Sequence, residues 1–148
     1  MKNKYPLSSS TWNDKEIVAI KKVIESDRYT MGRYVDEFEN AFSKYIGSKF
    51  SVMVNSGSSA NLLAIASLFY RQDKPLKRGD EVIVPAVSWS TTYSPLLQYG
   101  LKLKFVDIDL NSLNYDLEQL NNAITEKTRL LVVVNLLGNP NNFNEIKN

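Results

Sequence analysis

The feature that most constrains the fold is an alternation, after residue 49, of short apolar runs with segments of helical periodicity. The runs read FSVMV (50–54), EVIVPA (81–86), KLKFVDI (102–108) and RLLVVVN (129–135). The helical segments lie at 60–70, 91–99 and 117–124. Short runs rich in Val and Ile are typical of strands buried on both faces, and strands that alternate with helices form mainly parallel sheets. We therefore predict an α/β fold whose sheet has helices on both faces.

The first 47 residues follow a different pattern and are predicted to form a helical segment. After Asn13, apolar residues at three- and four-residue spacing predict a helix over 14–28. The same spacing recurs over 35–46, and Gly47 follows at the position of a helix C-cap. We accordingly divide the chain into an N-terminal helical segment, 1–47, and an α/β domain, 48–148.

The sequence stops at FNEIKN, a few residues into a helix predicted to begin at Phe143. This point comes soon after the most apolar strand, and a doubly wound sheet ended there would leave one flank of that strand uncovered. We therefore expect 48–148 to be an incomplete domain and the chain to be an N-terminal fragment of a longer protein.

Several classes of function are disfavoured by residues that the chain lacks. It contains no Cys and no His, which removes thiolate zinc sites, His-containing triads and most transition-metal centres, so we expect no metal. Its net charge of +2 is spread over interspersed acids and bases, without the basic stripe typical of nucleic-acid binding. No apolar run reaches the roughly 18 residues of a membrane span, and MKNKYPLSSS does not resemble a signal peptide. We expect a cytoplasmic protein.

The stretch VNSGSSANLL joins a predicted strand to a predicted helix. In open α/β sheets, ligands bind beyond the carboxyl ends of the strands, where helix N-termini present unpaired N–H groups. Gly57 would let the backbone turn and approach a ligand, and the amides and hydroxyls of Ser58 and Ser59 could hold a phosphate. Ser is equally favoured as an N-cap, so the turn could simply begin its helix. The chain has neither a P-loop motif nor a dinucleotide-binding G-x-G-x-x-G.

A second candidate site lies in VPAVSWSTTYSP, where Trp89 follows a predicted strand. A Trp in this position either fills a gap in the core or offers its ring to a flat ligand, and taken alone it favours the core. A phosphate loop after the preceding strand strengthens the ligand alternative. Asp107 and Asp109 could hold a ribose, but without a Gly-rich turn we expect them to cap the turn that follows.

Together these segments resemble the DegT-like sugar aminotransferase family, which consists of fold-type I enzymes that use pyridoxal 5′-phosphate and act on nucleotide-linked keto sugars. The resemblance covers nearly the whole chain and is carried by DRYTMG, SGSSANLL, RGDEVIVPAVSWSTTYSPLLQYG, FVDIDLNSLNYD and VNLLGNPNNF. AVSWSTTY and NLLGNPN look most like the branch that dehydrates GDP-4-keto-6-deoxy-D-mannose at C3, on the way to the dideoxy sugars of lipopolysaccharide. The resemblance implies the N-terminal part of a fold-type I large domain, and usually a homodimer.

The resemblance also implies a cofactor site. The amides of Gly57 and Ser58, with Ser59 assisting, would contact the cofactor phosphate, and Trp89 would stack on the pyridine ring. Tyr93 could face the same site.

For the substrate, the resemblance places Thr30, Met31, Gly32 and Arg33 near the entrance for the nucleotide sugar. Arg33 could there meet diphosphate charge, because a guanidinium matches phosphate geometry. The alternative for this segment is a solvated turn before the second helix.

In such an enzyme, glutamate converts the cofactor to pyridoxamine 5′-phosphate, and the C3 hydroxyl of the sugar is then lost. Aminotransferases of the family have a Lys that binds the cofactor covalently, whereas the 3-dehydratase branch has a His in its place as acid and base. That residue, and the acid that meets the pyridine nitrogen, would fall beyond Asn148, so we expect the chain alone to be inactive. A sugar aminotransferase and a non-catalytic module that binds a phosphorylated metabolite remain as alternatives.

Overall fold

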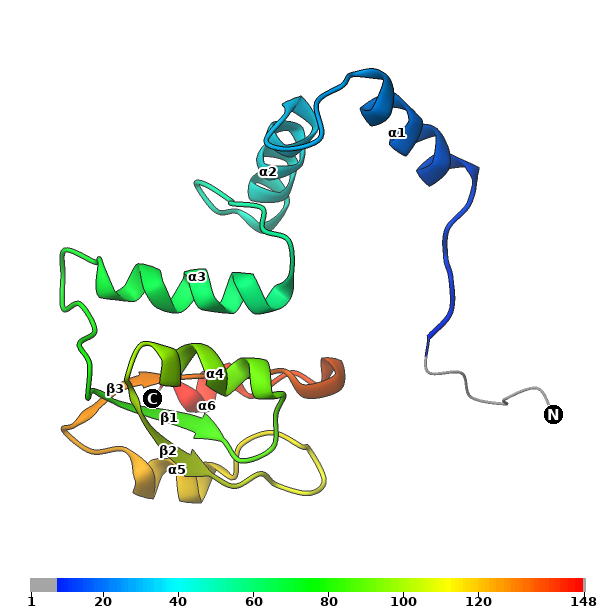
Figure 1. Cartoon of the computed structure of the whole chain (residues 1–148). Coiled ribbons are helices and arrows are strands. Elements are labelled where there is room, and N and C mark those ends of the chain that lie inside the picture. The colour runs from blue at the N-terminus through cyan, green and yellow to red at the C-terminus, as the bar shows by residue number, and fades with distance from the viewer. Residues whose placement is uncertain (1–7, 148) are drawn as a thin grey trace. The chain divides into compact units, whose positions relative to one another are not determined.

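The computed structural model describes residues 8–147, and the chain divides into two compact units, Met1–Met53 and Val54–Asn148. Figure 1 labels the elements of each unit. The first unit contains two helices, and the second contains the sheet with the helices that cover it.

Both helices predicted for the first unit are present, as α1 (Asp14–Glu25) and α2 (Arg33–Ile46). Asn13 begins α1 with a capping box: its side chain accepts from Lys15 N at 2.9 Å, and Glu16 accepts from Asn13 N at 2.7 Å. Gly47 ends α2 in the left-handed conformation, with φ +73°. The first helix ends earlier than predicted because the chain leaves helical geometry at Asp27, whose φ is +50°.

The predicted strand over 50–54 does not form. A strand needs a partner for its backbone hydrogen bonds, and within residues 8–147 this segment pairs with no other strand. Its backbone instead forms a hydrogen bond with a side chain of α2, in which Met53 N donates to Glu39 Oε1 at 2.7 Å. Phe50 and Val52 remain exposed.

The second unit contains a three-stranded parallel sheet in the order β2-β1-β3. The strands are β1 (Glu81–Pro85), β2 (Lys102–Val106) and β3 (Thr128–Leu131). Central β1 is the predicted EVIVPA strand, and its Val82, Ile83 and Val84 are completely buried. The prediction of a mainly parallel α/β sheet is confirmed.

Helices cover both faces of this sheet, as predicted (Figure 1). Because successive strand residues point to opposite faces, Val82 and Val84 pack beneath α3 (Gly57–Phe69) and α4 (Ser90–Gln98), in a cluster that includes the completely buried Leu96 of α4. Ile83 belongs to the opposite cluster, with residues of α5 (Leu117–Ala123) and α6 (Phe143–Ile146). No helix within the described residues is both long enough and apolar enough to cross a membrane.

The strand predicted from RLLVVVN is shorter than expected. It ends at Leu131, although Val132 N still donates to Ile83 O at 3.0 Å. β3 lies at the edge of the sheet, so along its outer side no further strand of residues 8–147 pairs with it. Residues 132–134 are half-buried for the same reason.

Tyr115 should make the stability of this unit depend on pH. Its buried hydroxyl donates to Val132 O at 2.7 Å, and burial, with a smaller contribution from Tyr93, raises the pKa of Tyr115. The stabilisation from a group with a raised pKa is complete below the unfolded pKa of about 10 and is lost as pH rises through the folded pKa. We expect urea denaturation to show a fall in stability above about pH 10.

In Tyr115→Phe this part of the pH dependence should disappear. The variant should also lose about 1 kcal/mol at neutral pH, because the carbonyl of Val132 then lacks its donor. Identical pH profiles for the two proteins above about pH 10 would contradict this account.

Candidate functional site

The turn Ser56–Ser59 begins α3, with Ser56 as its N-cap. Ser56 Oγ accepts from Ser59 N at 3.2 Å, and Ser59 Oγ donates to Asn55 Oδ1 at 2.6 Å. The N–H groups of Gly57 and Ser58 make no hydrogen bond within residues 8–147, and both residues are exposed. The turn therefore presents two amide donors at the positive end of a 13-residue helix.

Gly57 is not needed for the turn itself. It is the first helical residue, its φ lies outside the left-handed region, and a Cβ added to it would meet no atom within 4 Å. The expectation that Gly57 lets the backbone turn is therefore wrong. The open space beside this residue leaves room for a ligand to approach its N–H group closely.

Removing the cap of this helix should lower stability. In Ser56→Ala the N–H of Ser59 loses its acceptor, so we expect a loss of about 1 kcal/mol in urea denaturation. Ser67→Ala is the matched control, since Ser67 lies inside the same helix and only bonds back to Ala64 O. The control should be neutral or slightly stabilising, and equal losses in the two variants would count against a capping role.

Trp89 is the N-cap residue of α4, and its side chain is 74% exposed. It therefore does not fill the core of this unit, which was the interpretation that the residue alone favoured. Its indole face is accessible to a flat ligand. The first turn of α4 is ordered by the Ser88 and Thr92 hydroxyls, 2.8 Å apart, and by Thr92 N, which donates to Trp89 O at 2.9 Å.

Tyr93 connects α4 to the sheet. Its hydroxyl donates to Pro85 O at 2.7 Å, and its ring packs edge-on against Phe105 with centroids 5.4 Å apart. Burial raises the pKa of Tyr93, and a hydrogen bond with Ser88 opposes this effect. The geometry gives Tyr93 a structural role at the end of β1.

The structure brings the start of α3 and the start of α4 to the same end of the unit (Figure 1). The two helices pack against each other, and Asn61 Nδ2 donates to Thr91 O at 3.2 Å. Ser58 and Ser59 share a cavity of about 160 Å³ with Thr91 and other residues of α4. Trp89 is not among the residues that line this cavity.

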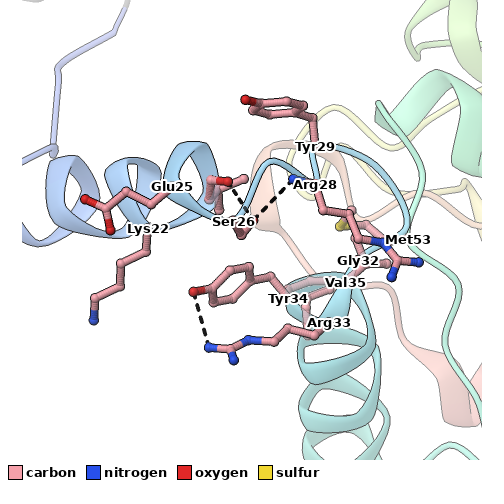
Figure 2. A pocket seen from close by; sticks show the side chains of 12 residues that line it. Lys22, Glu25, Ser26, Arg28, Tyr29, Gly32, Arg33, Tyr34, Val35 and Met53 are labelled. Atoms are coloured by element: carbon pink, nitrogen blue, oxygen red, sulfur yellow. Dashed lines mark hydrogen bonds between the residues drawn. The ribbon is translucent and has the colours of Figure 1, made fainter.

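A larger cavity, of about 820 Å³, lies within the first unit between the end of α1 and the start of α2 (Figure 2). Two of the predicted substrate residues, Gly32 and Arg33, line it. Thr30 and Met31 do not, although Met31 O accepts from the guanidinium of Arg28 at 3.2 Å.

Gly32 is buried and closely packed, whereas the side chain of Arg33 is exposed. Gly32 is the buried N-cap of α2, and a Cβ there would lie 3.4 Å from Arg28 Cδ, which is close packing. Arg33 Nε lies 3.7 Å from Glu37 Oε1, and Arg33 Cζ lies 4.9 Å from the centroid of the Tyr34 ring. Its side chain is 76% exposed, so the ion pair contributes little and the guanidinium remains accessible to an anion.

Arg28, Tyr29 and Tyr34 also line this cavity, and none of the three was among the residues predicted to bind the substrate (Figure 2). The sequence feature that could have indicated them is DRYTMGRY, in which one Arg-Tyr pair precedes the glycine and a second follows it. Both pairs line the cavity, and the chain turns between them at Met31, whose φ is +46°.

The two acidic residues after β2 accept hydrogen bonds from backbone N–H groups of the turn that follows, as predicted. Asp109 Oδ1 accepts from Asn111 N at 3.1 Å and from Ser112 N at 2.8 Å, and hydrogen bonding from Ser112 lowers the pKa of Asp109. Asp107 Oδ1 accepts from Ile108 N at 2.8 Å.

The LLGNP loop has a shape fixed by asparagine side chains. It starts with the short 3-10 helix η1 (Leu136–Gly138). Buried Asn141 donates to Val134 O at 2.9 Å and to Asn135 Oδ1 at 3.1 Å. Asn139 donates to Ser112 O, which connects this loop to the turn after β2.

Comparison with known proteins gives one family. The sequence profile of the DegT/DnrJ/EryC1/StrS aminotransferase family matches residues 11–148. The chain is 61% identical over 142 residues to GDP-4-keto-6-deoxy-D-mannose 3-dehydratase of Escherichia coli O55:H7. It is 35% identical over 144 residues to the lipopolysaccharide biosynthesis protein RfbH of Salmonella typhimurium. These alignments each cover 96% of this chain, but 37% and 33% of the respective relatives.

Solved structures show the same fold. The E. coli dehydratase with bound hydrated PLP superposes with a TM-score of 0.93 at 60% identity, over 97% of this chain and 37% of the other. Two further structures of GDP-4-keto-6-deoxymannose-3-dehydratase match equally well. One holds a trapped PLP-glutamate geminal diamine, and the other is a mutant with bound GDP-perosamine.

Proposed function

This chain belongs to the DegT/DnrJ/EryC1/StrS aminotransferase family, and on that premise we propose that the full-length protein is a pyridoxal phosphate-dependent enzyme acting on a nucleotide-linked 4-keto-6-deoxy sugar. The proposed reaction is loss of the C3 hydroxyl, in the synthesis of dideoxy sugars for lipopolysaccharide. The observation that carries this proposal is the 61% identity to a GDP-4-keto-6-deoxy-D-mannose 3-dehydratase. Since the chain spans about 37% of that relative, the activity is proposed for the longer protein.

The start of α3 fits the phosphate of this cofactor. Gly57 and Ser58 present N–H donors in an exposed first turn, and their position at a helix N-terminus favours negative charge. Ser59 N is already bonded to Ser56 Oγ and the Ser59 hydroxyl donates to Asn55 Oδ1, so Ser59 would assist only by exchanging the bond to Asn55 for one to the phosphate. We propose that Gly57 and Ser58 bind the phosphate and thereby orient the cofactor.

Trp89 is proposed to stack on the pyridine ring, since it is the exposed N-cap residue of α4, and α3 and α4 begin at the same end of the unit (Figure 1). Bound pyridoxal phosphate supplies a ring that withdraws electrons from the reacting carbon. The indole would hold the plane of that ring and exclude water from one face. The residues of this chain would thus bind and orient the cofactor. Proton transfer is assigned to other residues of the full-length protein.

For the nucleotide sugar, we propose the segment Thr30, Met31, Gly32 and Arg33, together with Arg28. The support is the cavity at the start of α2, which Arg28 and Arg33 both line. Two guanidinium groups suit a diphosphate, because each offers paired N–H donors to phosphate oxygens.

Glutamate is proposed as the amino donor and a homodimer as the assembly. The apolar residues left exposed on α1 and α2, among them Ile24 and Phe42, fit a partner surface. A nucleotide sugar and glutamate are cytoplasmic metabolites, so we keep the cytoplasm as the proposed compartment.

One experiment separates this function from its alternatives. The full-length protein is incubated with pyridoxal phosphate, glutamate and GDP-4-keto-6-deoxymannose, and the sugar product is identified by mass spectrometry. A 3-deoxy sugar supports the dehydratase. A 4-amino sugar would show an aminotransferase, the alternative that the family name favours. An unchanged sugar, with no cofactor bound, would indicate the non-catalytic module.

A further inference from the structure

Pro95 lies inside α4 and leaves a backbone carbonyl without its helical donor. In an α-helix the N–H of residue 95 would pair with the carbonyl of residue 91, but proline has no N–H group. The affected carbonyl, Thr91 O, belongs to the first turn of α4, two residues after Trp89. It therefore needs a donor from another part of the fold.

Asn61 supplies that donor, since its Nδ2 lies 3.2 Å from Thr91 O. Asn61 is on α3, four residues after Gly57, and residues with this spacing lie on the same face of a helix. The hydrogen bond therefore joins the face of α3 that carries Gly57 to the turn of α4 that carries Trp89.

We propose that Asn61 is a positioning residue that sets where Trp89 lies relative to the amides of Gly57 and Ser58. The proposal rests on the proposed function, in which these groups hold the ring and the phosphate of one cofactor. Tyr93 ties the same turn of α4 to Pro85 O in the sheet. The bond from Asn61 instead ties it directly to the helix that begins at the phosphate donors.

The consequence is preorganisation of the cofactor site. A phosphate and a pyridine ring in one small molecule have a nearly fixed separation, so both groups bind well only if the protein surfaces have a matching separation. Loosening α4 from α3 should therefore weaken ring stacking while leaving the phosphate donors intact.

The test is a double-mutant cycle in the full-length protein, with the Kd for pyridoxal phosphate measured by absorbance titration. We expect Asn61→Leu to raise this Kd roughly 3- to 10-fold, as for loss of a single hydrogen bond. In a Trp89→Ala background the same change should have no further effect, because there is no indole left to position. The inhibition constant for inorganic phosphate should stay unchanged in Asn61→Leu. Additive effects of the two changes, or weaker phosphate binding, would overturn the proposal.

Three further variants keep the test decisive. Asn61→Gln retains an amide donor and should recover part of the affinity. Pro95→Ala restores an N–H for Thr91 O, so Asn61→Leu should have a smaller effect in that background. Asn121→Leu, an exposed asparagine of α5, is the control and should bind as wild type. An equal effect of Asn61→Leu with Pro95 and with Ala at this position would contradict the inference.

The cycle also separates failure of this inference from failure of the proposed function. If Trp89→Ala leaves the Kd for pyridoxal phosphate unchanged, the cofactor site itself is wrong and the inference falls with it. If Trp89→Ala weakens binding and Asn61→Leu does not, only the positioning role is overturned.

Discussion

Gly57→Pro is expected to weaken binding of pyridoxal phosphate to the full-length protein roughly 10- to 100-fold without unfolding it. Gly57 is the first residue of α3, where proline is tolerated because that N–H has no helical acceptor. Ser56 has φ −162° and ψ 162°, the extended conformation favoured before proline. The variant therefore removes one charge-assisted donor to the phosphate, worth roughly 1.5 to 3 kcal/mol, and keeps the helix.

Gly57→Ala is the matched control because it keeps the N–H group. The added Cβ meets no protein atom within 4 Å, and alanine in a helix is more stable than glycine by about 0.5 to 1 kcal/mol. We expect a Kd near that of wild type by absorbance titration and a slightly higher urea midpoint. Unchanged binding in Gly57→Pro would show that this amide does not hold the phosphate. Equal weakening in both variants would indicate a steric effect.

Trp89→Ala is expected to raise the same Kd about tenfold or more and to shift the absorbance of the bound cofactor. Stacking between an aromatic side chain and a heteroaromatic ring contributes roughly 1 to 3 kcal/mol. Because the indole is 74% exposed, its removal leaves no cavity in the core, and the urea midpoint should change little.

Trp12→Ala provides the comparison for Trp89→Ala, since Trp12 is also exposed but belongs to the first unit. It should bind the cofactor as wild type does. If the two tryptophan variants have the same affinity and spectrum, the stacking role is refuted, and the phosphometabolite-binding alternative gains support.

The sheet could be predicted because the information lies in short stretches of sequence. Val82, Ile83 and Val84 form a continuous apolar run, which is stable only if both faces of the strand are covered. The strand predicted over 50–54 failed for the complementary reason. Its composition suits a strand, but pairing depends on a partner elsewhere, and a local pattern contains no information about that partner.

The start of α3 in the candidate site could be predicted from the sequence, but its contact with α4 could not. Ser56 and Gly57 indicate the start of a helix from their own residue types, whether or not a ligand is present. By contrast, the bond from Asn61 to Thr91 O joins residues 30 positions apart, and it matters because Pro95 removes the normal donor. Neither the hydrogen bond between Asn61 and Thr91 nor the exposure of Trp89 can be derived from residue spacing along the chain.

A crystal structure of the full-length protein with pyridoxal phosphate tests the central claim most directly. We predict that the phosphate oxygens lie within hydrogen-bond distance of the N–H groups of Gly57 and Ser58, with the indole of Trp89 parallel to the pyridine ring. A cofactor bound elsewhere, or these two amides covered by other protein atoms, would contradict the account.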